Sequence, residues 1–249
     1  LGQKLVCRIR DLLGRDPGVC IKHRHIPQGM DPRVRAARPH DLVDGTLLDS
    51  MTVWSSIDRE FLIENGISDP PPEVSDVVKK MTVDESSQYF IDRFGLRCTK
   101  EYVIKRIEDM VRQRYEKQIP LKPHAQEVLD FLDRRNVPYG IATATYKGLA
   151  EAALKRCGVY DRFRFLLTDR EYPAGKNFPD IFLGGAQRLG AQPDETLVIE
   201  DSLHCIETAK SAGFTVCGVY DPVAEADSSR IRELSDFYVK SLDGIIQII

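Results

Sequence analysis

The chain from Asp49 to Gly66 has apolar residues at the spacing of one helix face, namely Met51, Trp54, Ile57, Phe61 and Leu62. Asp69 and the three prolines after it end this helix. The same periodicity predicts three further helices, over residues 74–81, 83–94 and 100–117. Because no segment here alternates between apolar and polar residues as a strand does, we predict an all-helical unit over residues 51–120.

After residue 120 the pattern changes to short apolar runs that alternate with helical segments. The runs predict strands at 137–142, 163–167, 196–200, 215–219 and 237–239. The segments between them predict helices at 123–135, 148–157, 180–189, 202–212 and 228–234. Such alternation is typical of a parallel sheet with helices on both faces, in which ligands lie at the carboxyl ends of the strands. We therefore predict an α/β fold whose parallel sheet core is interrupted by the helical unit.

Residues 1–40 differ from the rest of the chain in charge. They contain nine Lys or Arg against three Asp, although the whole chain has a net charge of −3. A basic arm can indicate nucleic-acid binding. This segment, however, has no aromatic residue on which bases could stack, and it has Gly and Pro throughout without a sustained hydrophobic period. We interpret it as an atypical, poorly ordered segment, and we do not expect nucleic acid as a partner.

The overall composition indicates a soluble globular protein, with 42% hydrophobic and 29% charged residues. No apolar run approaches the roughly 20 residues that span a bilayer, and Leu5-Val6-Cys7 is too short for the apolar region of a secretory signal. The six scattered cysteines include no CxxC pair, which favours reduced thiols. We expect a cytoplasmic protein without a membrane partner, and the sequence gives no indication of its oligomeric state.

Two adjacent acids, Glu200 and Asp201, follow directly after an apolar strand. Placing two carboxylates near a core is costly without a cation. Mg²⁺ suits such a place, because it binds one or two carboxylates together with water and phosphate oxygens. The alternative is that Asp201 only caps the next helix. We consider the metal site the stronger interpretation.

Two further positions suit a phosphate group. Thr143 ends a predicted strand, where its hydroxyl and the backbone N–H of Ala144 can hold a phosphoryl oxygen. Lys176 precedes a predicted helix, and a lysine beside a phosphate neutralises charge that grows during transfer. Each residue alone has an ordinary explanation, because threonine is common in strands and a loop lysine is usually solvated.

The run from Asp41 to Ser50 has two acids, Asp41 and Asp44, and then a Gly-Thr turn. This run, the strand-end threonine, the lysine and the Glu-Asp pair follow one another on alternating α/β elements. In this order they resemble the motifs of the haloacid dehalogenase superfamily, specifically the members with a helical cap, such as phosphoglycolate phosphatase and β-phosphoglucomutase. The resemblance covers residues 44–249. It implies a Rossmann-like core over residues 41–50 and 121–249, with a cap over residues 51–120.

The resemblance also implies an activity, that of a Mg²⁺-dependent phosphatase acting on a small phosphorylated metabolite. In this family a carboxylate attacks phosphorus and forms an aspartyl-phosphate. Asp44 matches the general acid/base and is also implied as a metal ligand. Site residues implied by the remaining motifs are Thr143, Ala144 and Lys176 for phosphate, Lys176 also for catalysis, and Glu200 and Asp201 for the metal.

Two departures from the family pattern lie near residue 41. Leu42 occupies the position of the nucleophile, and a leucine side chain cannot attack phosphorus. Asp41 is a displaced nucleophile only if Val43 loops out, because a shift of one residue turns a strand side chain to the opposite face. The second departure is that residues 33–40 do not resemble the apolar first strand of the family. An atypical N-terminal sequence joined near residue 41 explains both departures.

Two alternatives to a phosphatase remain open from the sequence. One is a β-phosphoglucomutase-like phosphotransferase, which would need a cap that lets a bisphosphate reorient. The other is a non-catalytic relative that binds phosphate or metal.

Overall fold

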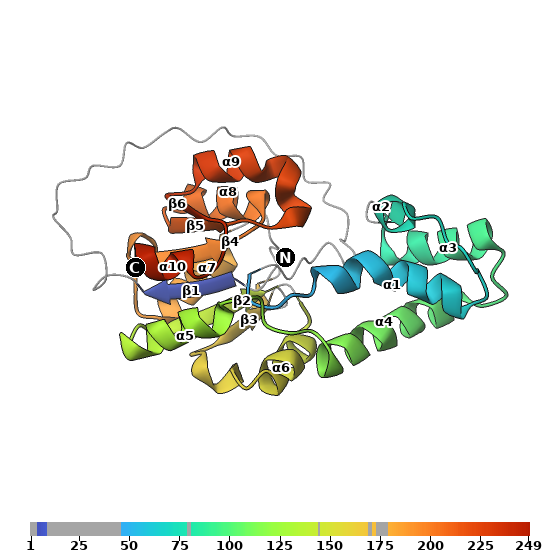
Figure 1. The fold of residues 1–249 in the computed structure, drawn as a ribbon, viewed down its shortest axis with the longest axis horizontal. Coiled ribbons are helices and arrows are strands. Elements are labelled where there is room, and N and C mark those ends of the chain that lie inside the picture. The colour runs from blue at the N-terminus through green and yellow to red at the C-terminus, as the bar shows by residue number, and fades with distance from the viewer. Residues whose placement is uncertain (1–3, 9–45, 79–80, 144, 169–170, 173–178) are drawn as a thin grey trace.

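The computed structural model describes residues 4–8, 46–78, 81–143, 145–168, 171–172 and 179–249. Within these residues a six-stranded sheet has the order β3-β2-β1-β4-β5-β6 (Figure 1). The strands are β1 (Lys4–Arg8), β2 (Tyr139–Thr143), β3 (Leu166–Thr168), β4 (Thr196–Glu200), β5 (Thr215–Val219) and β6 (Phe237–Val239). The predicted α/β class is confirmed.

The sheet is mixed, so the prediction of a parallel sheet needs one correction. β2 pairs with β3, β4 with β5 and β5 with β6 in parallel, as predicted. β1 instead runs antiparallel to both of its neighbours, β2 and β4. Because β2 and β4 are each antiparallel to β1, they run in the same direction as one another. Their carboxyl ends therefore meet at one edge of the sheet, which we call the catalytic edge.

The central strand β1 comes from the segment that we expected to be poorly ordered. Leu5, Val6 and Cys7 are 1%, 0% and 0% exposed. Leu5 and Cys7 pack on one face of the sheet and Val6 on the other, as the alternation of a strand requires. Residues 4–8 thus contradict the expectation for residues 1–40, whereas residues 9–45 lie outside the described part of the chain.

Helices cover both faces of the sheet (Figure 1). On one face the core includes side chains of α5 (Ala125–Arg134), α6 (Lys147–Arg156) and α10 (Gly244–Ile248). On the other it includes those of α7 (Asp180–Arg188), α8 (Leu203–Ser211) and α9 (Ser228–Leu234). Short 3₁₀ turns lie at η2 (Tyr160–Arg162), η4 (Pro193–Glu195) and η5 (Pro222–Asp227). The sheet is therefore buried on both sides, and the edges where its strands end are the places for chemistry.

Four helices extend away from the sheet on one side (Figure 1). They are α1 (Met51–Glu64), α2 (Val74–Val78), α3 (Val83–Phe94) and α4 (Lys100–Lys117). Thr82 and Glu85 form the capping box that starts α3, with the Thr82 hydroxyl accepting from the Glu85 N–H and the Glu85 carboxylate accepting from the Thr82 N–H. Phe61 and Phe90 are buried between these helices with ring centroids 5.7 Å apart. The helices of the predicted helical unit therefore end at residue 117, and from here on we call residues 51–117 the helical unit.

Two linkers join the helical unit to the sheet, and they are bound to each other. Leu48 and Leu121 form an isolated antiparallel bridge. The Asp49 N–H donates to the Pro120 carbonyl at 3.0 Å, and the Lys122 N–H donates to the Leu47 carbonyl at 2.8 Å. The end of the run from Asp41 to Ser50, which we call the first motif, therefore lies against the residues that return from the helical unit.

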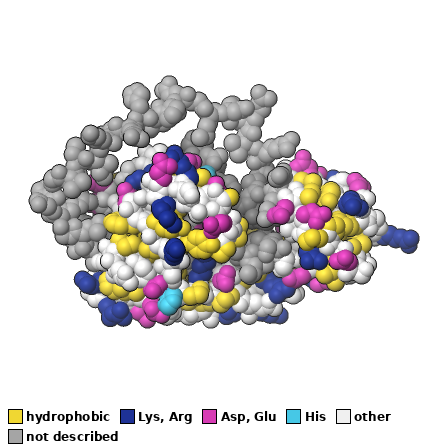
Figure 2. All heavy atoms as spheres, turned by 45° about the horizontal axis from the view of Figure 1, so that its top comes forward, with side chains coloured by type: hydrophobic (Ala, Val, Ile, Leu, Met, Phe, Trp, Pro, Cys, Tyr) yellow, Lys and Arg dark blue, Asp and Glu magenta, His cyan; other side chains and the backbone are white. Residues whose placement is uncertain are grey.

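No helix in the described residues is long and apolar enough to cross a membrane. Figure 2 shows basic and acidic side chains interspersed over both lobes of the face that it presents. Five cysteines of the described residues are free thiols, which are Cys7, Cys98, Cys157, Cys205 and Cys217.

The central position of β1 makes Leu5 a strong test of the fold. We expect Leu5→Ala to lower the free energy of unfolding by about 3 kcal/mol, because a buried side chain is lost and a cavity is left. Urea unfolding followed by circular dichroism measures this change. Leu183→Ala, at a side chain that is 38% exposed, is the control and should cost far less. If Leu5→Ala costs no more than this control, β1 does not occupy the centre of the sheet.

Candidate functional site at the catalytic edge

Polar side chains end the strands at the catalytic edge. Thr143 is the last residue of β2, Glu200 is the last residue of β4, and Asp201 follows it. These side chains are 1%, 0% and 2% exposed, respectively. Strands β2 and β4 flank β1, so the two predicted motifs lie on either side of the central strand at the same edge.

The turns after these strands are fixed by local hydrogen bonds. The Thr143 hydroxyl accepts from the Thr145 N–H at 3.0 Å. The Glu200 carboxylate accepts from the Ser202 N–H at 2.9 Å. Both bonds bend the backbone away from the strand direction two residues on, a common use of side chains in turns.

Thr46 joins the first motif to the Glu200-Asp201 pair. Its hydroxyl donates to the Asp201 Oδ1 at 3.0 Å, across 155 residues of sequence, and the bond is buried. Thr46 itself is 0% exposed. Helix α8 begins after Ser202 and has no side-chain cap hydrogen bond. The alternative that Asp201 serves as the cap of this helix is therefore wrong.

Burial changes the acidity of Asp201. Desolvation and the neighbouring negative charge of Glu200 raise the pKa of Asp201 from 3.8 to about 7. Lys122 and the Thr46 hydrogen bond act in the opposite direction, whereas Asp221 raises the pKa further. A carboxylate held in this way is stabilised by a nearby cation or hydrogen-bond donor. The edge therefore favours a positively charged ligand.

An ion pair lies beside this carboxylate. The Lys122 Nζ is 2.6 Å from the Asp221 Oδ2, and the two side chains are 14% and 3% exposed. The other oxygen of Asp221 accepts from the Val223 N–H at 2.9 Å. Asp221 follows β5, the neighbour of β4, and Lys122 lies on the linker that returns from the helical unit. The pair thus connects this linker with the catalytic edge.

The structure brings together only part of the predicted site. It places Thr143, Glu200 and Asp201 at one edge, together with Thr46 of the Gly-Thr turn. The remaining predicted positions lie outside the described residues, and these are Asp41, Leu42, Asp44, Ala144 and Lys176. Within the described residues no group of three or more His, Cys, Asp or Glu side chains is arranged to hold a metal ion. Glu200 and Asp201 are nevertheless two adjacent buried carboxylates at this edge.

Sequence reasoning missed Lys122 and Asp221. Asp221 had a usable signal, because it is an acid just after a predicted strand, as Asp201 is. Lys122 had none, since its partner lies 99 residues away and nothing in its neighbours distinguishes it from a solvated lysine.

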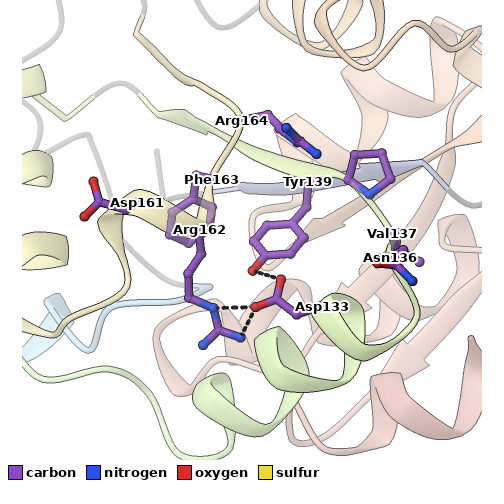
Figure 3. A pocket seen from close by; sticks show the side chains of 9 residues that line it. Asp133, Asn136, Val137, Tyr139, Asp161, Arg162, Phe163 and Arg164 are labelled. Atoms are coloured by element: carbon purple, nitrogen blue, oxygen red, sulfur yellow. Dashed lines mark hydrogen bonds and ion pairs between the residues drawn. The ribbon is translucent and has the colours of Figure 1, made fainter.

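A hollow of about 420 Å³ lies at the opposite edge of the sheet (Figure 3). The Tyr139 hydroxyl donates to the Asp133 Oδ1 at 2.8 Å, and the Arg162 Nε donates to the Asp133 Oδ2 at 2.8 Å. Burial and the bond to Asp133 raise the pKa of Tyr139. Because Tyr139 and Arg162 both donate hydrogen bonds to Asp133, we interpret these residues as a structural contact between α5 and η2.

A family model described as haloacid dehalogenase-like hydrolase matches residues 41–219. The chain belongs to this family. The chain is 27% identical to a probable pseudouridine-5′-phosphatase of Drosophila melanogaster over 191 residues, 72% of this chain and 80% of that protein. It is 27% identical to hexitol phosphatase A of Escherichia coli over 203 residues, 82% of this chain and 90% of that protein.

Solved structures support the same family at the level of the fold. A crystal structure of a candidate β-phosphoglucomutase from Thermotoga maritima superposes with a TM-score of 0.74 at 21% identity. The match covers 83% of this chain and 97% of that one. The resemblance to the haloacid dehalogenase superfamily predicted from the motifs is confirmed.

The raised pKa of Asp201 predicts a pH dependence of stability. Between the unfolded value near 4 and the folded value of about 7, the folded state keeps a proton that the unfolded state has released. The free energy of unfolding of the metal-free protein should therefore fall as the pH rises through this window. Asp201→Asn keeps an oxygen for the Thr46 hydroxyl and removes the charge. At pH above about 7 the free energy of unfolding of Asp201→Asn should be higher than that of the unmodified protein by on the order of 4 kcal/mol.

Urea unfolding at several pH values in the presence of a chelator measures this difference. Asp227→Asn, at an exposed aspartate of η5, is the control and should keep the pH slope of the unmodified protein. If the free energy of unfolding has the same pH slope in Asp201→Asn and in the unmodified protein, folding does not raise the pKa of Asp201.

Proposed function

We propose that this protein is a Mg²⁺-dependent phosphatase that hydrolyses a small phosphorylated metabolite through an aspartyl-phosphate. The observation that carries the proposal is the buried hydrogen bond from Thr46 to Asp201. It joins the turn that follows the predicted acids to the predicted metal carboxylates, beside Thr143 at the same edge. Two of the relatives, named as a probable pseudouridine-5′-phosphatase and as hexitol phosphatase A, support a small phosphate ester as the substrate.

The residues present fit a hard divalent cation. Glu200 and Asp201 are buried oxygen donors, and the pKa of Asp201 is raised by burial and by the negative charges of Glu200 and Asp221, which Lys122 offsets only in part. Mg²⁺, when bound, would neutralise the phosphoryl oxygens and lower the repulsion of an attacking anion. Glu200, Asp201 and Asp44 are the residues proposed to hold it.

The other residues have separate roles in the proposal. Thr143 and the backbone of Ala144 hold phosphoryl oxygens, and Lys176 neutralises the charge that develops on them. Asp44 protonates the leaving oxygen and then activates the water that releases phosphate from the aspartyl-phosphate. Residues 51–120 act as a cap that covers the substrate and excludes bulk water.

The nucleophile is the part of the proposal that depends on the unusual sheet. β1 runs antiparallel to β2, so its carboxyl end, Arg8, lies at the edge opposite the site. A strand in this direction does not lead into the first motif, as the family pattern requires. Residues 9–45 separate β1 from the described part of the first motif and lie outside the described residues. We therefore propose Asp41 as the nucleophile, because Leu42 has no reactive group.

Phosphate release from a panel of sugar and nucleotide phosphates tests the activity. We expect turnover that requires Mg²⁺ and is lost on chelation. Asp44→Asn should lower kcat by about 10²–10⁴-fold, the usual contribution of a general acid/base. Tyr139→Phe, at the opposite edge, is the matched control and should keep the turnover of the unmodified protein.

Two further variants identify the nucleophile. Asp41→Asn should abolish turnover and the acid-stable labelling of the protein by radioactive phosphate. The unmodified chain, which has Leu42, should be active without the substitution Leu42→Asp. If the unmodified chain is inactive and Leu42→Asp gains activity, the nucleophile is missing from this chain. If neither the chain nor Leu42→Asp turns over any ester but Mg²⁺ still binds, the protein is a binding relative.

A further inference from the structure

A lysine, Lys122, lies beside the acids at the catalytic edge and carries the opposite charge. We define the acid cluster as Glu200, Asp201 and Asp221, which are 0%, 2% and 4% exposed. Burial raises the pKa of Asp201, and the negative charges of Glu200 and Asp221 raise it further. Lys122 is the cation that acts against this interaction, and its Nζ lies 2.6 Å from Asp221.

The position of Lys122 is fixed by the backbone as well as by charge. Its N–H donates to the Leu47 carbonyl at 2.8 Å, and its carbonyl accepts from the Ala125 N–H at 3.1 Å. The side chain is 14% exposed, so solvent screens it weakly. Lys122 therefore holds its charge at a defined place beside the cluster, at the foot of the helical unit.

We propose that Lys122 is a positioning residue whose ion pair with Asp221 sets the net charge of the acid cluster and so tunes its affinity for the divalent cation. The inference rests on the proposed Mg²⁺ site. With both partners present, Asp221 contributes little net charge to the edge. Loss of the lysine leaves a buried negative charge there, and loss of the aspartate leaves a buried positive charge.

The two single substitutions should therefore change metal affinity in opposite directions. Lys122→Met keeps the length of the side chain and should lower the Kd for Mg²⁺ by about tenfold, because an unpaired Asp221 attracts the cation. Asp221→Asn should raise the Kd by about tenfold, because an unpaired Lys122 repels it. The double variant removes both charges, and its Kd should return to within about threefold of the unmodified protein.

Titration calorimetry of the full chain with MgCl₂ measures these values. It is done at about pH 8.5, above the pKa of about 7 at which Asp201 ionises. Lys210→Met and Asp236→Asn are matched controls, because this ion pair also has a 2.6 Å contact and lies at the opposite edge of the sheet. Both controls should leave the Kd unchanged within about twofold.

A purely structural role makes a different prediction. If Lys122→Met and Asp221→Asn both weaken Mg²⁺ binding, the pair only holds the fold and the proposal is wrong. Should Lys122→Met fail to give the circular dichroism of the unmodified protein, Asp221→Asn and the double variant still test the reversal of sign. Absence of Mg²⁺ binding by the unmodified protein would instead overturn the proposed metal site, and this inference with it.

Discussion

The pairing of β1 with both β2 and β4 is the constraint on which the rest of the structure depends. Without a strand between them, the facing N–H and C=O groups of β2 and β4 would be buried without partners. Neighbouring strands are about 4.8 Å apart, so β1 also holds the ends of β2 and β4 about 10 Å from each other. Thr143 and Glu200 thereby end two strands that lie on either side of β1.

Because of its direction, β1 completes the centre of the sheet but does not lead into the first motif. In its place at the centre it supplies apolar side chains to both faces of the sheet and completes both hydrogen-bond ladders. It does not deliver the first motif, because its carboxyl end lies at the far edge. Thr46 therefore has a larger part in the organisation of the site, since its hydrogen bond to Asp201 ties the first motif to the sheet.

Burial gives the catalytic edge its electrostatic character. Asp201 is nearly removed from water and lies beside other acids, so its charged form is costly until a cation or a donor is near. Lys122 offsets part of this cost and belongs to the linker of the helical unit. The linkers that connect the helical unit to the sheet are thus in direct contact with the groups that determine the charge of the site.

The sequence by itself determined most of the helices and strands and the positions of Thr143, Glu200 and Asp201 at the ends of strands. Helices α3 and α4 and strands β4, β5 and β6 have the predicted bounds, because their periodicity, caps and breakers are local. The family followed from motif order. Only the tertiary structure decided that residues 4–8 fill the centre of the sheet, since three apolar residues give no signal of a buried strand. It also decided the Thr46–Asp201 and Lys122–Asp221 contacts, which span 155 and 99 residues. No local pattern encodes such pairs, because their energy arises only when packing brings the two groups together and removes water.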